Sequence, residues 1–296
     1  MKIGETEIQE TFAEAFPMHF VSLIITAADE YWLNAALNEV TGYSASVISC
    51  DAETGISSRL DPADTPDGRI GAEVLVFGFS ADALQKAVPN RVGQCVMTCP
   101  STAVYDGNPD SEVRIGLGKQ IRFFGDGFQK AKMVADRRYW RVPVMDGEFL
   151  IQDTLNVGRG VGGGNIILQS SCKTEALAAA RRGAEAVEAC AGVIAPFPGG
   201  VARSGSKVGS IYKALPASTA EAYCPTLRGR VESKLLDETV AAYEIVVDGV
   251  DEEAVANGMA AAARAVAGDC ILQIGAGNYG GELGKYHFHL HEVLGS

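Results

Sequence analysis

The segment VSLIITA at residues 21–27 decides the fold, because this β-branched apolar run predicts a buried strand. Apolar residues then recur at roughly helical spacing over 29–40, and Gly42 suits the C-terminal cap of a helix. The short segment 45–49 predicts a return to strand. Together the three segments predict one βαβ unit.

This order of strand, helix and strand repeats along the chain. A second set in the first half lies at 73–79, 82–92 and 95–98. Two further sets in the second half lie at 165–170, 174–190 and 193–195, and at 242–247, 252–266 and 270–274. Paired βαβ units are typical of the ferredoxin-like split βαβ sandwich, in which helices cover one face of an antiparallel sheet. We therefore predict an α/β (α+β) fold of two ferredoxin-like lobes that arose by internal duplication.

Between the halves lie strand-like segments separated by Gly-containing hairpin signals, at 119–124, 139–144 and 148–152. The signals are the stretches 125–127 and 146–147. We expect an N-terminal lobe at 1–157, which includes this β-hairpin extension, and a C-terminal lobe at 158–296.

The charge of the chain restricts its partners. Its 296 residues include 25 Lys and Arg against 37 Asp and Glu, a net charge of −12. Nucleic-acid binding needs clustered cations, and the only basic doublets are Arg137-Arg138 and Arg181-Arg182. Nucleic acid and anionic membrane surfaces are therefore excluded as expected partners. Hydrophobic residues at 47% allow a sizeable core.

Membrane and compartment signals agree with this reading. The longest apolar stretches, 20–28 and 254–267, are shorter or more interrupted than the roughly 20 apolar residues that cross a bilayer. The acidic start at 1–5 lacks the apolar region of a signal peptide. Seven cysteines without a CxxC pair are expected to be reduced thiols. We therefore predict a cytoplasmic protein that does not bind membranes.

A glycine motif follows the last predicted strand, where Gly275–Gly280 reads GAGNYG and matches G-x-G-x-x-G. Dinucleotide binding requires a helix to follow, with its N-terminus at the pyrophosphate. The residues that follow, GELG at 281–284, are strand-like instead. Close approach by a ligand or another subunit is therefore favoured, and an NAD-dependent dehydrogenase stays open as an alternative that bound nucleotide would reveal.

His287, His289 and His291 alternate with apolar residues, so on a strand their imidazoles share one face. Neighbouring side chains on one strand face diverge, whereas zinc needs three or four converging ligands. An exposed or interface face is favoured, and we predict no metal. No G-x-S-x-G elbow or Ser-His-Asp arrangement is visible in the sequence, so a nucleophilic side chain is not predicted.

Two segments carry candidate site residues. The SGSKVGS segment at 204–210 can present backbone N–H groups and the Lys207 cation to an anion, with a flexible surface loop as an equal alternative. In the strand-like YEIVVD at 243–248, Glu244 has the apolar neighbours Ala242 and Val246. A carboxyl among apolar groups tends to hold its proton, which favours an acid catalyst, while a solvated strand glutamate is the alternative.

Several blocks together resemble one family, the formylmethanofuran:tetrahydromethanopterin N-formyltransferases. The match runs from end to end, in TFAEAF (11–16), TPDGR (65–69), RVGQCV (91–96), APFPGG (195–200), SGSKVG (204–209), YCP (223–225), YEIV (243–246), GNYGG (277–281) and HLH (289–291). The chain departs from the family pattern at 49–55, SCDAETG for the usual MCPAEAG, and at 201–203, VAR where IVA is common.

The resemblance implies transfer of a formyl group between the amine of methanofuran, or an analogue, and N5 of tetrahydromethanopterin. Both would act as co-substrates, with no permanently bound cofactor, metal or nucleotide. The resemblance also implies a homotetramer. Bacterial relatives are subunits of a formyltransferase/hydrolase complex, so other complex subunits are expected partners. The alternative is a catalytically silent structural subunit of such an assembly.

The resemblance makes Glu244 the expected catalytic acid. A protonated Glu244 would donate to the tetrahedral oxyanion and then protonate the leaving amine. Backbone N–H groups of the Gly-rich turns 162–165 and 277–281 are the expected further donors. The expected substrate-binding residues are Ser206, Lys207, Gly163, Asn165, Asn278 and Tyr279.

Overall fold

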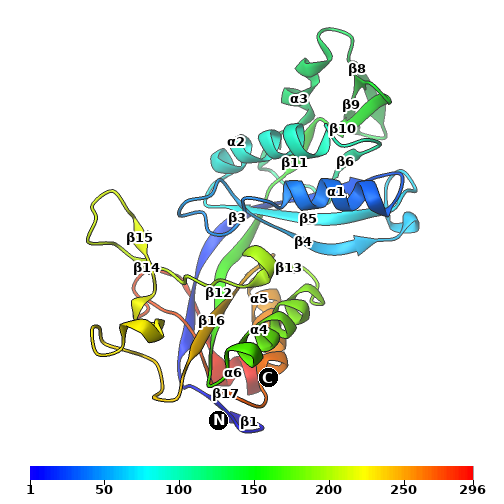
Figure 1. The fold of residues 1–296 in the computed structure, drawn as a ribbon. Coiled ribbons are helices and arrows are strands. Elements are labelled where there is room, and N and C mark those ends of the chain that lie inside the picture. Colours follow the sequence, from blue (N-terminus) through cyan, green and yellow to red (C-terminus); the bar gives the residue numbers. More distant parts are fainter. Residues whose placement is uncertain (296) are drawn as a thin grey trace. The chain divides into compact units, whose positions relative to one another are not determined.

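The chain folds into two compact units in the computed structural model, which describes residues 1–295 (Figure 1). The middle unit is Met18–Gly160. The terminal unit combines Met1–Pro17 with the chain from Val161 onward. Both ends of the chain therefore belong to the terminal unit.

The middle unit has the order strand, helix, strand, strand, helix, strand. Its elements are β3 (Phe12–Thr26, from Met18 onward), α1 (Glu30–Val40), β4 (Glu53–Leu60), a 3-10 turn η1 (Pro62–Asp64), β5 (Gly71–Gly78), α2 (Ala81–Arg91), a π-helical turn η2 (Val92–Val96) and β6 (Ala103–Asp106). The strands lie in the order β4-β5-β3-β6, and neighbours are antiparallel. This is the predicted ferredoxin-like arrangement.

A hairpin extension continues this sheet. Its elements are β7 (Arg114–Gly116), α3 (Gly118–Ile121), a 3-10 turn η3 (Arg122–Gly125), β8 (Lys130–Val134), β9 (Arg137–Val144), β10 (Gly147–Gln152) and β11 (Thr154–Asn156). β10 pairs with β6 and β9, and β9 pairs with β8. The predicted turn at 146–147 is confirmed, whereas the predicted strand at 119–124 is wrong because α3 and η3 occupy it.

The terminal unit repeats the order of the middle unit. Its elements are β1 (Lys2–Ile3), β2 (Thr6–Ile8), β12 (Gly158–Ser170, from Val161 onward), α4 (Lys173–Glu188), β13 (Val193–Ile194), η4 (Pro198–Gly200), β14 (Lys207–Val208), β15 (Ala217–Ser218), η5 (Glu221–Tyr223), η6 (Pro225–Leu227), β16 (Ala241–Gly249), α5 (Glu252–Val266), β17 (Ile271–Gly275), β18 (Tyr286–His289) and α6 (Leu290–Gly295). β13, β16, β12 and β17 lie in that order with antiparallel neighbours. The ferredoxin-like strand order predicted for each half of the chain is thus confirmed.

The N-terminal segment belongs to the terminal unit, which differs from the expected lobe of 1–157. β2 runs parallel to β17, with Glu7 opposite Gln273 and Ile8 opposite Ile274. Residues 12–15 of β3 pair with β18. These pairings cover strand edges that would otherwise expose unpaired backbone groups. The pairing of the N-terminal segment with β17 and β18 joins residues more than 250 positions apart, so no local sequence pattern predicts it.

Two further predicted strands are wrong. Residues 45–49 form turns, and the strand of that position is β4, eight residues of mixed polarity that begin at Glu53. Residues 95–98 continue the helical path of α2, since Val92 and Val96 bury their side chains against the core from η2. A short apolar run does not by itself distinguish a strand from a buried helical turn.

The core of the terminal unit fixes the position of β16. Ile245 and Val247 of this strand are fully buried in one cluster with Val255 and Met259 of α5. Alternation along the strand turns Glu244 to the opposite face. Within the described residues 1–295 no helix is both long and apolar enough to span a bilayer.

A glycine in α4 sets how closely this helix approaches the core. A Cβ on Gly183 would lie 2.5 Å from Cδ1 of Ile245 and 2.6 Å from Cγ2 of Val266. Overpacking costs about 1–3 kcal/mol, which exceeds the roughly 0.5–1 kcal/mol that a helix gains when alanine replaces glycine. We therefore expect Gly183→Ala to lower the midpoint of thermal unfolding. Gly93→Ala is the control, because a Cβ at Gly93 meets no atom within 4 Å. Equal midpoints for the two variants would contradict this account of the helix packing.

Candidate active site

Glu244 lies in the middle of β16, and its backbone is held on both sides. Ile167 of β12 is its partner across one ladder. On the other side the Ala202 N–H donates to the Glu244 carbonyl at 2.8 Å, and the Glu244 N–H donates to the Ala202 carbonyl at 3.1 Å. The side chain therefore starts from a fixed backbone, which suits a residue that must meet a reacting group.

The carboxyl of Glu244 is partly buried, and burial raises its pKa to about 7. Desolvation disfavours the charged form, so a substantial fraction of this side chain holds its proton near neutrality. Gly205 contributes to the burial, because a Cβ at this glycine would lie 3.6 Å from Oε2 of Glu244 and 2.7 Å from Cβ of Ala220. The segment 204–220 could not pack this closely with a larger residue there.

The charge of Glu244 affects the pKa of two phenols, Tyr223 and Tyr279. Burial raises the pKa of Tyr223, and the negative charge of Glu244 raises it further. Burial also raises the pKa of Tyr279, an effect that a hydrogen bond from Ser206 opposes and that the charges of Glu244 and Glu14 reinforce. Both phenols therefore keep their protons at neutral pH and can act as hydrogen-bond donors. Glu244, Tyr223, Tyr279 and Ser206 form the candidate site.

Lys207, expected to bind substrate, is paired with a carboxylate in the structure, and its contact with substrate remains a prediction. It lies on β14, half exposed, and its ammonium forms an ion pair with Glu221. β14 pairs with β15 as a small separate hairpin. The ion pair neutralises the cation that would attract an anion.

The glycine-rich loop after β17 is held by hydrogen bonds that involve Asn165 and Gly163 of β12 and Asn278 of the loop itself. The buried Asn165 accepts from the Gly277 N–H at 2.6 Å and donates to the carbonyls of Gly277 at 3.2 Å and Gly163 at 3.0 Å. The Asn278 amide donates to the Phe12 carbonyl at 3.0 Å. The polar groups of the two asparagines are thus used within the protein, and contact with substrate remains a prediction.

Several of the backbone N–H groups expected to stabilise an oxyanion are also engaged. The Gly163 N–H donates to Asp248 at 2.9 Å, and the Gly280 N–H donates to the side chain of Asn278 at 3.1 Å. The N–H groups of Tyr279 and Gly281 donate to Glu14. These four N–H groups are therefore not free to donate to a substrate oxygen.

Glu14 is the residue that sequence reasoning missed. Its buried carboxylate accepts four backbone N–H groups, from Tyr279 at 2.6 Å, Gly281 at 2.9 Å, Leu283 at 2.6 Å and Gly284 at 2.5 Å. Burial raises its pKa, but these four hydrogen bonds outweigh burial and hold the pKa below its ordinary value. The available signal was a glutamate inside the apolar block TFAEAF together with a glycine-rich segment near the other end of the chain.

The histidines do not form a common face. His287 and His289 are exposed on β18, whereas His291 lies in α6 with Nε2 2.9 Å from the Ile8 carbonyl. The expectation of three imidazoles on one strand is therefore wrong for His291, because the strand ends at His289. Across residues 1–295 no group of three or more His, Cys, Asp and Glu side chains is placed to hold a metal ion. The glycine motif at 275–280 is followed by turns and not by the helix that dinucleotide binding requires.

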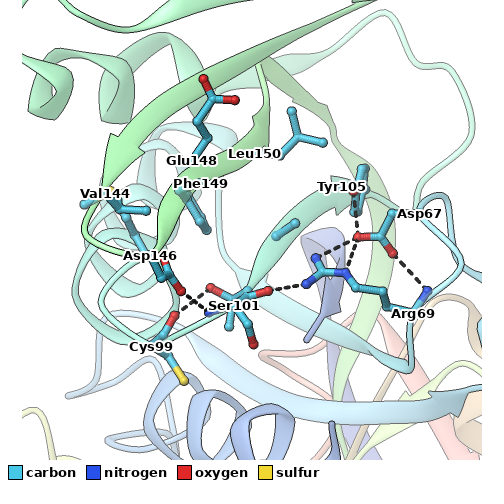
Figure 2. Close-up of a pocket in the computed structure, with 13 residues that line it drawn as sticks. Asp67, Arg69, Cys99, Ser101, Tyr105, Val144, Asp146, Glu148, Phe149 and Leu150 are labelled. Atoms are coloured by element: carbon cyan, nitrogen blue, oxygen red, sulfur yellow. Dashed lines mark hydrogen bonds and ion pairs between the residues drawn. The ribbon is translucent and has the colours of Figure 1, made fainter. Parts of the chain in front are cut away.

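A separate pocket of about 350 Å³ lies within the middle unit (Figure 2). Arg69 is its only cationic lining residue, and its guanidinium bonds Asp67, the Ser101 carbonyl and Thr26. Burial raises the pKa of Asp67, but the hydrogen bonds and charge of Arg69 outweigh burial and lower it. These contacts engage the Arg69 guanidinium within the protein, so the pocket offers no free cation to an anionic ligand.

A partly buried carboxyl with a raised pKa and two protonated phenols, on a two-lobed α/β scaffold, can combine proton donation with hydrogen bonding, as in an acid-catalysing enzyme. Comparison with known proteins gives the reaction class. The family model of formylmethanofuran-tetrahydromethanopterin formyltransferase matches residues 1–144, and the model of the proximal lobe of that family matches 147–293. The chain belongs to this family, as its sequence blocks predicted.

Individual relatives match over their full length. The Methylococcus capsulatus formylmethanofuran–tetrahydromethanopterin formyltransferase is 48% identical over 99% of this chain and 100% of that protein. The structure of the Methanosarcina barkeri enzyme aligns with a TM-score of 0.93 at 40% identity, covering 99% of this chain and 100% of that one. A chain of the Methylorubrum extorquens formyltransferase/hydrolase complex, solved with methylofuran, aligns with a TM-score of 0.95 at 44% identity. The alignment covers 99% of this chain and 98% of that one.

Proposed function

We propose that this protein transfers a formyl group between the amine of methanofuran, or a methanofuran analogue, and N5 of tetrahydromethanopterin, with Glu244 as the acid. The observation that carries the proposal is the raised pKa of this carboxyl, beside Tyr223 and Tyr279, in a member of the formyltransferase family. Both cofactors act as co-substrates, and no permanently bound cofactor is required.

The reaction needs no nucleophilic side chain, because N5 of the pterin is itself the nucleophile. The N5 lone pair adds to the formyl carbon, and the carbonyl oxygen gains negative charge. Hydrogen bonds placed where this charge develops lower the barrier. The C–N bond to the methanofuran nitrogen then breaks as Glu244 protonates that nitrogen, and the N5 proton returns to the carboxylate. The acid is restored, and atoms and charge balance in either direction.

We infer that hydroxyl donors stabilise the developing negative charge. Burial raises the pKa of Tyr223 and of Tyr279, so both phenols stay protonated at neutral pH. The N–H groups of Gly163, Tyr279, Gly280 and Gly281 are engaged within the protein, which favours these phenols as donors to the oxyanion. Positioning of the two substrates supplies a further part of the rate.

A direct test uses the purified protein alone with both substrates. Formation of formyl-tetrahydromethanopterin at the expense of formylmethanofuran supports the proposal. Transfer that appears only with other subunits present would instead support the alternative of a structural subunit. That alternative has one supporting observation, the similarity to a chain of the Methylorubrum extorquens complex.

The pH dependence of turnover follows from the pKa of Glu244. The protonated acid is the active form, so we expect kcat for transfer to fall as pH rises through about 7. Folding raises this pKa above 4.5, so the stability that the protonated carboxyl contributes is present at low pH and is lost as pH rises through about 7. Titrations of kcat and of the unfolding free energy check both signs. Glu244→Gln should show neither trend, and a pH profile unchanged by that substitution would contradict the assignment.

We also propose self-association into a homotetramer, with other complex subunits as further partners, in the cytoplasm. Large apolar side chains are exposed in both units, including Phe124 and Phe128 after α3 and Ile211 and Tyr212 between β14 and β15. Exposed apolar groups of this size are typical of association surfaces. The free thiols of all seven cysteines accord with a reducing compartment.

The assembly is checked by light scattering of the purified protein. We expect a particle several times the 31.1 kDa of one chain. Charged substitutions at Ile211 and Tyr212 should reduce the particle mass if the β14–β15 segment takes part. A particle of one chain mass at working concentration would contradict the tetramer.

A further inference from the structure

The carboxylate of Glu14 is saturated by one loop. Oε2 accepts the N–H groups of Tyr279 and Gly281, and Oε1 accepts those of Leu283 and Gly284. A buried charge is costly unless hydrogen bonds compensate it, and here all four donors come from six consecutive residues. The left-handed backbone of Gly280 and Gly281, with φ of +77° and +79°, turns successive N–H groups toward one point.

The loop 279–284, which is held by hydrogen bonds to Glu14, includes Tyr279 of the candidate site. Glu14 accepts its hydrogen bond from the Tyr279 N–H itself, so it fixes the backbone of the residue whose phenol has its pKa raised in part by the charge of Glu244. The Tyr279 ring also packs beside Phe16, with ring centroids 6.3 Å apart. A single residue, Tyr279, therefore links Glu14 to the proposed reaction site: its N–H binds Glu14, and its phenol is the proposed donor.

We propose that Glu14 is a positioning residue for formyl transfer, whose carboxylate fixes the loop 279–284 so that the Tyr279 phenol lies beside Glu244. The inference rests on the proposed function of the site. Glu14 itself takes no part in proton transfer, because both its oxygens are occupied by backbone donors.

Glutamine cannot replace this glutamate. The amide oxygen of Glu14→Gln could accept two of the four N–H groups, but its NH₂ would face the other two donors. One pair of backbone donors would lose its acceptor, and the loop would move away from the amide. A displacement of about 1 Å at a catalytic group can cost about 10²-fold in rate.

The experiment compares Glu14→Gln with Thr6→Val. Thr6 is fully buried in the same unit, and its hydroxyl bonds Gly268 and Ile271 at the start of β17, whereas Glu14 holds the loop after the end of β17. Each substitution removes buried hydrogen bonds next to β17: Thr6→Val at the start of the strand, and Glu14→Gln in the loop that follows it. We expect Glu14→Gln to lower kcat by about 10- to 100-fold. Thr6→Val should lower the unfolding midpoint but leave kcat of the folded protein near wild type. Equal effects of the two on kcat would overturn the proposal.

A double-substitution cycle with Tyr279→Phe separates positioning from general loss of structure. If Glu14 acts through Tyr279, Glu14→Gln should cost little in kcat once the phenol is absent. If the double variant instead loses kcat by the product of the two single losses, the proposal is overturned. If Glu14→Gln does not fold, Gly284→Ala serves instead, because its Cβ would lie 2.5 Å from the Ala15 carbonyl oxygen and displace the same loop without altering charge.

Amide hydrogen exchange keeps the two proposals distinguishable. Exchange over 279–284 should accelerate in Glu14→Gln whether or not the protein is active. Wild-type protein without transferase activity would contradict the proposed function. An active wild type whose Glu14→Gln and Gly284→Ala variants keep full kcat would contradict the positioning role alone.

Discussion

Replacement of Glu244 by glutamine is expected to lower kcat by about 10²- to 10⁴-fold, the usual contribution of general acid catalysis. Glutamine keeps the shape of the side chain but has no proton to transfer to the leaving amine. Substrate affinity should change little, because the lost interaction develops only as the C–N bond breaks. Steady-state kinetics in both directions measure the effect.

The control for this experiment is Glu253→Gln, an exposed glutamate at the start of α5. Surface substitutions usually change stability by less than about 0.5 kcal/mol, so its activity should match the wild type. Thermal unfolding of Glu244→Gln checks that the fold is intact. Near wild-type turnover in that variant would remove Glu244 from the mechanism and leave substrate positioning and the phenols as the sources of rate.

Removal of the Tyr279 hydroxyl is expected to lower kcat by about 10²- to 10³-fold, the range found when one oxyanion donor is lost. Tyr279→Phe keeps the ring beside Phe16 and the backbone bond to Glu14, so the loop should stay in place. The effect should be large because the neighbouring backbone donors are engaged within the protein.

Tyr212→Phe is the matched control, because Tyr212 is 66% exposed between β14 and β15. This variant should retain full activity. A Tyr279→Phe variant that changes KM and not kcat would show that the phenol binds substrate equally in the ground and transition states. In that case the oxyanion donor would be Tyr223.

The sequence predicted the terminal unit more accurately than the middle unit, and the reason is periodicity. The predicted helix at 252–266 and the strand at 242–247 fit because small and branched apolar residues recur there with a clear period. In the middle unit β4 has mixed polarity and η2 is apolar, so a reading of apolar runs placed strands at 45–49 and 95–98 instead. In short elements such as β4 and η2, the hydrophobic pattern does not distinguish a strand from a helical turn.

The site was predictable where chemistry depends on one residue and its neighbours in sequence. The apolar surroundings of Glu244 indicated a raised pKa, which the structure bears out. The roles of Glu14 and Tyr223 depend on contacts between distant segments, which no local pattern contains. Lys207 was expected as a free cation because its partner Glu221 lies 14 residues away.

The return of the N-terminal segment to the terminal unit has a consequence for synthesis on the ribosome. Thr6 bonds Ile271, 265 residues later, and β2 completes its pairing only when β17 has emerged. Residues 18–160 are continuous, so this part can fold while the rest is still being translated. The first 17 residues can form the local β1–β2 pairing, but they lack their partners β17 and β18 until those strands have been synthesised. Nascent chains truncated before β17 should therefore contain a protease-resistant core of residues 18–160 and a cleavable N-terminus.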